Sequence, residues 1–581
     1  MKARSYLSIF LVLLLLLCQI SCAPQGQGDE TTEPPSQIAD TEAISETSCE
    51  DAEGEVTLYS DGKWQYRTVT RAVRNTGEKD FSFGLTGVLS DLFGSAPHSA
   101  NDTAIKGEDV CEMIIGYTAH PQMRSIYAGL SYGQAAVRVL GNKIYVAAYT
   151  QEGFTALLSH VEALIKRSYS GGELSLKIGE LETFINVNEE LNTLPTLEDA
   201  EFLDYYDCGL GQTMLVLSGG SIDAFENYVK KFDAGSCVST VYESGNAFAT
   251  FDLGDELINV SFAKNDKRLR IIRNKDTEPT SLFAEPTETT NICEPLIIMH
   301  GLGWEKGKDN GLCIVIRLSD GRFIVVDGGF NRQRDADELY KLLKDNTPAG
   351  MEPTVAAWFI THGHSDHHGT FATLFCARYK ASVNVENVMF NPPENKLFVG
   401  TVSNPTSSAI NARITMLNAI KAFKAHHVRS HIGDRYYIGD AVVDVLYSID
   451  YQYPTTFDYY NTSSLIFSIK LAGQRIIITG DASNESFKRA VEMYGADLKC
   501  DIVQVAHHGY TTGVSASAST SVIQGYRYMS PSLVLWPISA DGYEVVRNDT
   551  YNVALSSLPS VKRILVARDD DHVIQLPFSA S

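Results

Sequence analysis

A histidine-rich segment between an expected strand and an expected helix constrains this chain more than any other feature. Val355-Ala-Ala-Trp-Phe-Ile360 is an unbroken apolar run, which is typical of a buried strand. It continues directly into Thr361-His-Gly-His-Ser-Asp-His-His-Gly369, and a helix is expected over Phe371–Tyr379. The polar side chains therefore gather on a tight turn, and the helix that follows directs its first N–H groups toward them, which favours an anion.

The residue types in this turn are those of a metal site. Side chains of alternate residues at a strand end share one side, so His362 and His364 can contact the same ion. Asp366 and His367 follow and can face a second ion a few ångströms away. Imidazole and carboxylate are ligands that suit zinc, manganese or iron. The alternative, four unrelated polar residues in a loop, fits the HxHxDH spacing poorly.

A hairpin is expected upstream of this turn. Cys313–Leu318 and Arg322–Val326 are apolar runs joined by the turn signal Ser319-Asp-Gly321. The second run ends in Asp327-Gly-Gly329. Either the strand simply stops at glycines, or the aspartate supports the metal site, and the triplet alone does not decide between these readings.

Two more strand ends carry polar residues downstream. Arg475–Gly480 predicts a strand that ends in Asp481, and Ile502–Ala506 predicts one that ends in His507-His-Gly509. Alone, the first is an ordinary turn and the second a polar strand edge. After a complete HxHxDH, metal binding becomes the better interpretation of both.

The order of these motifs resembles that of the metallo-β-lactamase superfamily, over about 290 residues from 291 to 581. The resemblance implies an αββα sandwich with Asp481 bridging two metal ions. It also implies that Asp327 orients a ligand imidazole without touching the ion. His508 would be a ligand and His507 would face the substrate, although the two roles are interchangeable at this stage.

One position departs from the family pattern. Many members carry a further histidine ligand on the strand before the bridging aspartate, and the matching expected strand here is Asn461–Ile469, with Asn461 in the histidine's place. With TGD and HHG following, the pattern resembles the subgroup of phosphorylcholine esterases and the hydrolase domain of DNA-uptake competence proteins. His426, His427 and His431 are expected to be solvated loop residues, but one of them could supply the missing ligand.

The resemblance implies a hydrolase with one or two divalent transition-metal ions, Zn²⁺ first and Mn²⁺ or Fe as alternatives. Asp366 would orient an attacking hydroxide, and His507 and Asn461 would donate hydrogen bonds to the substrate or leaving group. Phosphoester, and specifically phosphodiester, hydrolysis is the leading hypothesis, with a small-molecule or cell-envelope substrate. The alternatives are a lactonase or amidase of the same fold, or a surface binding lipoprotein with an inactive hydrolase domain.

The N-terminus predicts export. Lys2 and Arg4 precede an apolar run, Leu7–Cys18, that suits the core of a signal peptide over residues 1–21. Ile20-Ser-Cys22 resembles a bacterial lipoprotein box, which implies lipidation at Cys22, although Gln19 departs from the family's leucine and leaves plain secretion as the alternative. Residues 22–49 are polar and predict a flexible tether. Together these features predict a lipoprotein anchored to the membrane at the cell surface or facing the periplasm.

Two small α+β domains are expected before the hydrolase domain, over residues 50–185 and 186–290. In the first, the stretch from Glu112 to Ala147 resembles the ancillary domain found beside some glycoside hydrolases, but it has no catalytic motif, so a packing or spacer domain is the preferred interpretation. Thr277–Asn291, rich in proline, threonine and glutamate, predicts the linker to the third domain. Neither N-terminal unit has a catalytic motif or a group of His, Asp and Glu residues at the spacing of metal ligands. Both are therefore expected to be scaffold or recognition domains.

The net charge and the cysteine pattern bear on two further questions, nucleic-acid binding and disulfide formation. A formal net charge of −23 over 581 residues argues against tight non-specific binding to nucleic acid. The eight cysteines after the leader show no CxxC pair, so most are expected to be small buried residues. Export permits disulfides, and Cys49–Cys111 and Cys208–Cys237 are possible pairs.

Overall fold

The computed structural model describes residues 54–579 except 105, 108, 198–199, 276–278, 289, 303–309, 394–406, 453–459, 511–519 and 568–569. The expected leader, Cys22 and the expected tether lie outside these residues. Within the described ranges, no helix is long and apolar enough to cross a membrane. Residues 53–581 form one compact unit.

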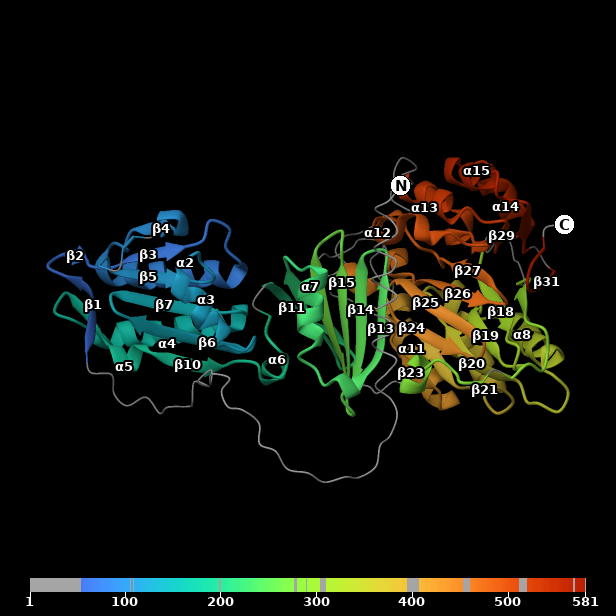
Figure 1. Ribbon diagram of the computed structural model, residues 1–581, viewed down its shortest axis with the longest axis horizontal. Coiled ribbons are helices and arrows are strands. Elements are labelled where there is room, and N and C mark those ends of the chain that lie inside the picture. Colours follow the sequence, from blue (N-terminus) through green and yellow to red (C-terminus); the bar gives the residue numbers. More distant parts are fainter. Residues whose placement is uncertain are drawn as a thin grey trace, which may run out of the picture. The chain divides into compact units, whose positions relative to one another are not determined.

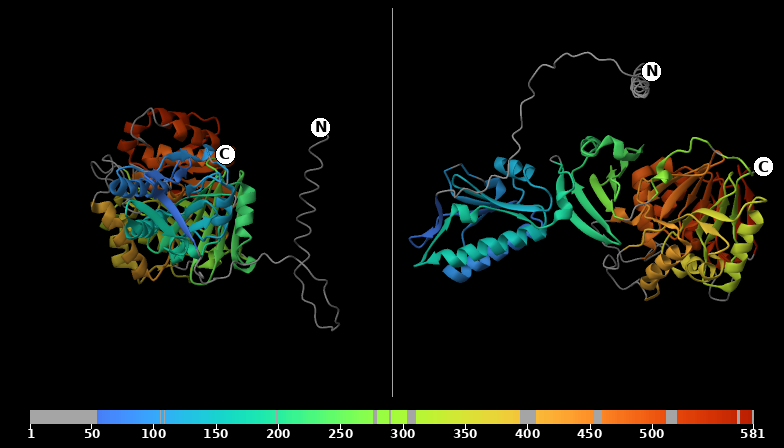
Figure 2. Two further views of the ribbon diagram at one scale, coloured as in Figure 1. Left: turned by 90° about the vertical axis from the view of Figure 1, so that its left-hand side faces the viewer. Right: turned by 90° about the horizontal axis from the view of Figure 1, so that it is seen from below.

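The first part of this unit is built on a mixed six-stranded sheet in the order β10–β6–β7–β5–β3–β4. Helices α2 (Thr76–Phe93) and α4 (Gln151–Ser168) run side by side over one face (Figure 2). Helix α3 (Pro121–Ala128) covers the other face, where its Met123 and Tyr127 pack among apolar residues of the sheet. The strands are β3 Arg67–Thr70, β4 Ser99–Asn101, β5 Glu112–Ile115, β6 Gln134–Leu140, β7 Lys143–Ala148 and β10 Thr183–Asn186.

A small antiparallel sheet, in the order β2–β1–β9–β8, extends this region. Its strands are β1 Glu55–Ser60, β2 Lys63–Trp64, β8 Tyr169–Ser170 and β9 Glu173–Lys177. Two short helices, α5 (Ile178–Leu181) and α6 (Glu189–Asn192), flank β10 along the chain. Helix α2 begins at a capping box in which Asn75 and Glu78 each accept a backbone N–H of the other, which explains why the helix starts there.

The middle region is a six-stranded antiparallel sheet in the order β11–β12–β16–β15–β14–β13 (Figure 1). Helix α7 (Ile222–Val229) packs on one face through Phe225 and Tyr228. The other face contacts the C-terminal region, where Phe248 lies against Gly433. A Cβ at Gly433 would overlap that ring, and the φ of 85° there also favours glycine. The strands are β11 Glu201–Gly209, β12 Gln212–Ser218, β13 Cys237–Glu243, β14 Asn246–Asp252, β15 Leu257–Ala263 and β16 Arg268–Asn274.

The expected linker is packed against the C-terminal region. It contains a 3₁₀ turn, η3 (Thr280–Phe283), whose Leu282 and Phe283 are buried in the largest core cluster. Phe283 packs on Tyr436, with 5.3 Å between ring centroids. Proline, threonine and glutamate dominate the composition of this stretch, but the apolar side chains of Leu282 and Phe283 fix it to the C-terminal core.

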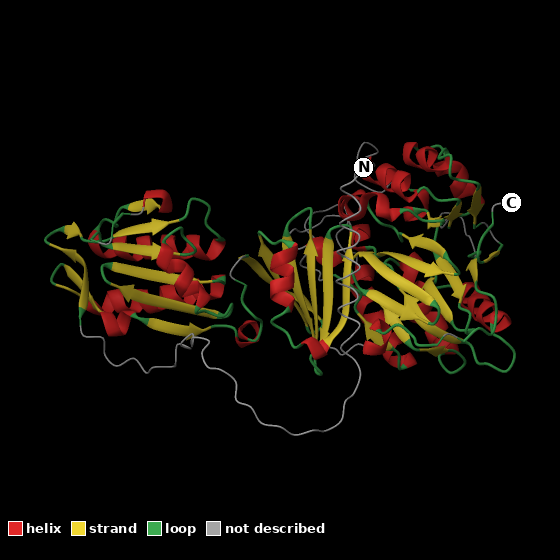
Figure 3. Ribbon diagram, viewed as in Figure 1, coloured by secondary structure: helices red, strands yellow, loops and turns green. Residues whose placement is uncertain are grey.

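Two sheets face each other in the C-terminal region (Figure 3). The first has the order β23–β22–β20–β19–β18–β17–β31, with β21 paired to β20. Its strands are β17 Leu296–Met299, β18 Cys313–Arg317, β19 Phe323–Asp327, β20 Thr354–Phe359, β21 Asn384–Val385, β22 Asn387–Met389, β23 His426–Val428 and β31 His572–Gln575. The second, in chain order, has β24 Arg435–Ile438, β25 Ala441–Tyr447, β26 Ile466–Leu471, β27 Gln474–Ile478, β28 Ile502–Gln504, β29 Leu533–Trp536 and β30 Arg563–Val566.

Helices cover the outer face of each sheet, and an apolar core fills the space between the sheets. Helices α8 (Gln333–Asn346) and α11 (Ser407–Phe423) pack on the first sheet. Helices α12 (Asn484–Tyr494), α13 (Thr520–Met529) and α15 (Thr550–Ser556) pack on the second, and α14 (Ala540–Val546) lies between α13 and α15 along the chain. The expected α+β architecture with a C-terminal αββα sandwich is therefore confirmed.

The helix after the histidine-rich turn begins earlier than expected. Helix α9 spans Ser365–Thr370, followed by a π-helical turn η4 (Phe371–Phe375) and α10 (Cys376–Tyr379). Asp366 and His367 thus lie in the first helical turn and not in the loop before it. Glycine and threonine at 369 and 370 gave no sign of a helix, but Gly369 packs tightly on the backbone of Phe330 and Asn331.

The possible Cys208–Cys237 disulfide is not formed, because both residues are free thiols. Cys208 is buried near Met214 and Ile272, while Cys237 is exposed at the start of β13. Cys111 is also free, and its possible partner Cys49 lies outside the described residues. Cys313, Cys376 and Cys500 are buried, as expected of small apolar side chains.

Candidate metal centre

The residues expected to hold metal follow the carboxyl ends of strands in both sheets. β19 and β20 are parallel neighbours in one sheet, and β27 and β28 are parallel neighbours in the other. Asp327 ends β19 and His362 follows β20, while Asp481 and His508 follow β27 and β28. Loops that follow parallel strands leave the sheet at the same edge, so these side chains meet at one edge of the sandwich.

One group of four buried side chains can hold a metal ion. Asp366, His367, Asp481 and His508 each offer one ligand atom, and these atoms lie within 4.8 Å of one another. Asp481 Oδ1 is 3.2 Å from His367 Nε2 and 3.3 Å from His508 Nε2. Asp366 Oδ2 is 3.5 Å from His508 Nε2. Two imidazoles and two carboxylates form a donor set that suits a divalent transition metal.

A second group shares Asp481 with the first. His362, His364 and Asp481 also offer ligand atoms within 4.8 Å of one another. His362 Nε2 is 2.9 Å from His364 Nδ1 and 3.8 Å from Asp481 Oδ2. The two oxygens of Asp481 thus face different groups, Oδ1 the first and Oδ2 the second. This is the placement needed for a carboxylate that bridges two ions.

Hydrogen bonding shows that the first group fits a cation. His367 Nε2, His508 Nε2 and Asp481 Oδ1 are buried and have no hydrogen-bond partner among the described residues. A buried polar atom left in this state costs about 1–3 kcal/mol. One divalent cation placed among the three atoms would satisfy all of them.

Neighbouring groups fix how the two imidazoles point. Asp327 lies with Oδ2 2.6 Å from His367 Nδ1, and Thr361 donates its backbone N–H to Oδ1 (2.8 Å) and its hydroxyl to Oδ2 (2.7 Å). His508 Nδ1 donates to the Pro537 carbonyl at 2.9 Å. A proton held on Nδ1 leaves Nε2 as the lone-pair nitrogen, and Nε2 is the atom that faces the metal group in both residues.

Asn310 also supports the site, although no motif pointed to it. Its Nδ2 donates to Asp366 Oδ2 at 2.5 Å. The next residue but one, Leu312, donates its backbone N–H to the Asp366 carbonyl at 3.2 Å. The only signal in the sequence was an Asn-Gly pair just before an expected strand, which usually marks a turn.

The backbone is strained at three of these positions. Asp327, His507 and His508 have φ values of 54°, 49° and 53°, in the left-handed region that non-glycine residues rarely adopt. Such a conformation costs about 1–2 kcal/mol per residue. All three residues lie at the metal groups, so the strained backbone conformation directs their side chains toward the site.

Electrostatics differ between the two groups. Burial lowers the pKa of His362 and of His364, so both imidazoles are neutral. Burial opposes protonation of His508 as well, but Asp481 and Asp366 raise its pKa to about 9. The same carboxylates, with Asp327, raise the pKa of His367 well above its ordinary value.

The two carboxyl groups respond in the opposite sense. Although both are buried, His367 and His508 hold the pKa of Asp366 and the pKa of Asp481 below the ordinary range. The carboxylates are therefore ionised and surrounded by groups that can carry positive charge. Protons on the two imidazoles provide that charge in the metal-free protein, and a divalent cation would replace them.

His507 lies beside the metal groups, and Asn461 lies in a turn that contacts the loop after Asp481. His507 has its side chain 19% exposed, with Nε2 3.9 Å from Asp481 Oδ2, whereas His508 is fully buried. Asn461 is buried in a 3₁₀ turn, η7 (Tyr460–Ser463), and not in the strand expected from 461, because β26 begins only at Ile466. The neighbouring Thr462 hydroxyl lies 2.9 Å from that of Ser483, which connects this turn to the loop after Asp481.

The three upstream histidines do not join either ligand group in the described residues. His426 is exposed, and His427 Nε2 donates to the Phe390 carbonyl at 2.7 Å. The expectation of a solvated loop residue is wrong for His431, which is 1% exposed. Its Nδ1 is 2.7 Å from Asp450 Oδ2 and its Nε2 is 2.8 Å from Asn274 Nδ2. Asn274 belongs to β16, so the middle region covers this histidine.

Comparison with known proteins agrees with this geometry. Residues 307–531 match the family model described as Metallo-beta-lactamase superfamily. A search of curated proteins finds no match to the chain.

Among solved structures, YhfI from Bacillus subtilis, a metallo-beta-lactamase fold protein, is similar at 12% identity over 48% of this chain and 100% of YhfI, with a TM-score of 0.31. Zn²⁺-bound PqqB from Methylobacterium extorquens is similar at 10% identity over 48% of this chain and 100% of PqqB, with a TM-score of 0.30. Similarities this distant give no information about a substrate.

Proposed function

We propose that this chain is a metal-dependent hydrolase that cleaves phosphoester bonds, phosphodiesters in particular, and the match of residues 307–531 to the metallo-beta-lactamase superfamily model supports the hydrolase part of this proposal. The observation that carries the proposal is the position of Asp481 between two groups of ligand atoms. Sites that hold two cations suit phosphoester cleavage, since the cations stabilise both the attacking and the leaving oxygen. The donor set of imidazoles and carboxylates favours Zn²⁺, with Mn²⁺ or Fe as alternatives.

Divalent cations, when bound, supply Lewis acidity that lowers the pKa of a water molecule and neutralises charge on a phosphoryl oxygen. The chain's own residues would then orient the reactants. Asp366 is buried, ionised and fixed by Asn310, so it can accept a proton from the attacking water or hold it in line. His507 is partly exposed beside Asp481 and can donate a proton to the leaving oxygen.

Asn461 supports the choice of phosphoesters within the superfamily. An amide is a weak metal ligand but a good hydrogen-bond donor, so an asparagine at the position of the family's histidine ligand would suit contact with a phosphoryl oxygen. The pattern of Asn461 with TGD and HHG resembles the subgroup that contains the phosphorylcholine esterases.

The test is a substrate panel on the metal-loaded protein. We expect turnover of bis-p-nitrophenyl phosphate or p-nitrophenylphosphorylcholine, and loss of that turnover in His362→Ala. Arg563→Ala, which changes an exposed residue of the same domain, serves as the matched control. Hydrolysis of lactones or β-lactams without any phosphoesterase activity would sink the proposal, and metal loading without any turnover would favour an inactive binding protein.

The proposal includes export and anchoring. A leader and lipoprotein box at the N-terminus would hold the hydrolase domain outside the cytoplasmic membrane, within reach of cell-envelope phosphate esters. Cys22→Ala should release the protein from the membrane fraction into the soluble fraction. Retention of this variant on the membrane would contradict lipidation at Cys22.

A further inference from the structure

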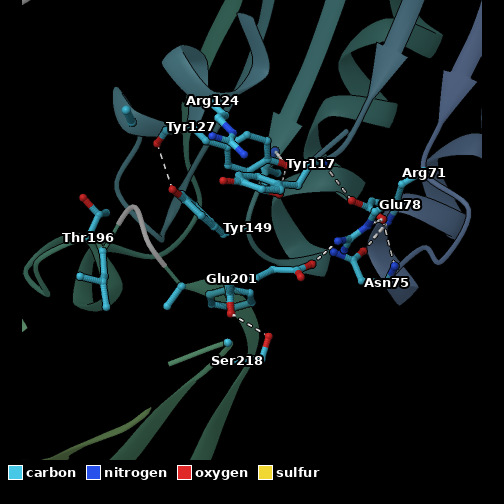
Figure 4. A pocket seen from close by; sticks show the side chains of 16 residues that line it. Arg71, Asn75, Glu78, Tyr117, Arg124, Tyr127, Tyr149, Thr196, Glu201 and Ser218 are labelled. Carbon is cyan, nitrogen blue, oxygen red and sulfur yellow. Dashed lines mark hydrogen bonds and ion pairs between the residues drawn. The ribbon is translucent and has the colours of Figure 1, made fainter. Parts of the chain in front are cut away.

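A cavity of about 460 Å³ lies outside the hydrolase domain, between the first and the middle regions of the same compact unit (Figure 4). One side is formed by α3 and the loop after β5, which contribute Arg124 and Tyr117. The other side is formed by residues around the start of β11 and the end of β12, including Phe202 and Ser218. Small-molecule sites commonly have volumes of about 300–1,000 Å³. The cavity thus has the size of a ligand site.

A row of aromatic rings lines one wall of the cavity. Tyr117, Tyr127 and Tyr149 pack edge to face in sequence, with 4.9 Å between each pair of ring centroids, and Phe202 lies 5.8 Å from Tyr149. Tyr127 donates its hydroxyl to the Ala148 carbonyl and Tyr149 donates its hydroxyl to the Tyr127 carbonyl, each at 2.9 Å. These bonds hold Tyr127 and Tyr149 in place. Tyr127 is buried, so the half-buried rings of Tyr117 and Tyr149 form the apolar surface that a flat ring can reach.

The two acidic residues of the cavity share one arginine. Glu78 is fully buried and accepts hydrogen bonds from Arg71 (2.8 Å) and from the backbone N–H of Tyr117 (3.0 Å). Arg71 also pairs with Glu201, an ion pair that joins the first region to the middle one. Figure 4 shows Arg71, Glu78 and Asn75 together on one side of the cavity. These groups close one end of the cavity and carry one net negative charge, because one arginine faces two carboxylates.

Arg124 differs from Arg71. It is exposed at the cavity, and it makes no ion pair or hydrogen bond within the part of the chain that the structure describes. Its guanidinium balances the net negative charge of the Arg71 group over the cavity as a whole, but it forms no ion pair with Glu78 or Glu201, so its donors stay available. A guanidinium with all its donors available suits a carboxylate or a phosphate, which it can bind through two parallel hydrogen bonds.

From this geometry we propose that the cavity binds a sugar ring that carries one anionic group. The apolar face of the ring lies on the tyrosine row, and the anion pairs with Arg124. Hydroxyl and amide side chains at the rim, from Thr196, Ser218 and Asn75, are suited to bond the hydroxyl groups of a sugar. The anion can be a carboxylate or a phosphate, as in a uronic acid or a sugar phosphate. The site is independent of the metal groups and of the proposed hydrolysis.

The test is equilibrium binding to the purified full chain, depleted of metal with EDTA so that the metal groups take no part. Isothermal titration calorimetry with galacturonate, glucose 6-phosphate, glucose and benzoate separates the contributions. We expect saturable binding of one or both acidic sugars, and the tighter one identifies the anion. Glucose should bind at least 10-fold more weakly, because the charge-assisted bonds to Arg124 are absent.

Two variants complete the test. Arg124→Ala should weaken acidic-sugar binding at least 10-fold without changing the melting temperature, since the side chain has no described partner to lose. Arg563→Ala removes an exposed arginine of the hydrolase domain and should bind like the wild type. Equal binding by Arg124→Ala and wild type, equal binding of glucose, binding of benzoate in preference to the sugars, or no saturable binding would each overturn the proposal.

Discussion

Two buried clusters of histidine and carboxylate lie in the C-terminal region, and they differ in whether their polar atoms are satisfied. In the network around His431, both ring nitrogens have partners, Asp450 on one side and Asn274 on the other. In the metal groups, His367 Nε2 and His508 Nε2 are buried without a hydrogen-bond partner among the described residues. Residue types are the same in both places. The satisfied cluster joins two regions of the fold, and the unsatisfied one leaves space for a cation.

The carboxylates of the two clusters also differ in how many hydrogen bonds they accept. Asp450 accepts from His431, from the Ser448 hydroxyl at 2.7 Å and from Asn391 at 3.3 Å. Asp481 Oδ1 has the two imidazole nitrogens at 3.2 Å and 3.3 Å, as ion-pair contacts that lack hydrogen-bond geometry. The comparison predicts that changes in one cluster alter metal content and activity, while changes in the other alter stability.

The largest expected effect comes from Asp481→Asn. This variant removes the charge shared by both groups, so we expect loss of bound metal and a fall in phosphoesterase activity of at least about 100-fold, more than the loss that supporting residues alone typically cause. Asp450→Asn is the matched control, a buried carboxylate of the same domain outside the metal groups. Normal metal content in Asp481→Asn would remove the distinction between the clusters.

The next effect is on stability. His431→Ala leaves Asp450 buried without its main partner, so the free energy of unfolding should fall by about 3 kcal/mol, as for other broken buried pairs. Urea denaturation followed by circular dichroism measures this change, and metal content should stay at the wild-type level. A variant that loses metal but keeps its stability would place His431 in the metal site after all.

Stability of the metal-free protein should depend on pH in a specific window. The pKa of His508 is raised from 6.5 to about 9 in the fold, so its contribution is fully present below pH 6.5 and is lost as the pH rises through 9. We expect a fall in the free energy of unfolding of about 3 kcal/mol across this window. The metal-loaded protein should lack this fall, because the ion replaces the proton. If the stability of the metal-free and the metal-loaded protein depends on pH in the same way, His508 does not exchange a proton for the ion.

A smaller effect is expected from Asp327→Asn. Asparagine has the same shape and tolerates the positive φ, but it removes the charge that orients His367. Metal affinity, measured by competition with a chelating dye, should fall by about 10–100-fold, as for other residues that support a ligand. Asn310→Ala should lower the metal affinity by about 10-fold, the lower end of that range. An unchanged metal affinity in both variants would show that the contacts of Asp327 and Asn310 do not orient the ligands.

The sequence could predict the metal groups because spacing and strand ends determine them. The spacing at the strand end assigned His362 and His364 to one ion, and the resemblance to the family assigned Asp481 and His508 to the same site. The same argument could not find Asn310, whose role depends on a contact with Asp366 across 56 residues of chain. It also could not anticipate that Asn274 covers His431, since that contact crosses 157 residues.

Local patterns failed where packing decides the structure. The helix at Ser365 begins six residues earlier than its apolar residues indicated, because the metal-site residues themselves form its first turn. Asn461 lies in a 3₁₀ turn although the residues after it have a strand pattern. In both cases the deviation lies at the metal site, where the placement of the site's side chains outweighs the local secondary-structure propensity.

The central claim is that Asp481 lies between two cation sites, and the metal content of the purified chain tests it most directly. Inductively coupled plasma mass spectrometry on protein loaded with Zn²⁺ and then desalted should give close to two equivalents in the wild type and far less than one in Asp481→Asn. One equivalent that remains after Asp481→Asn, or a wild type that carries no more than about 0.2 equivalents, would contradict the account.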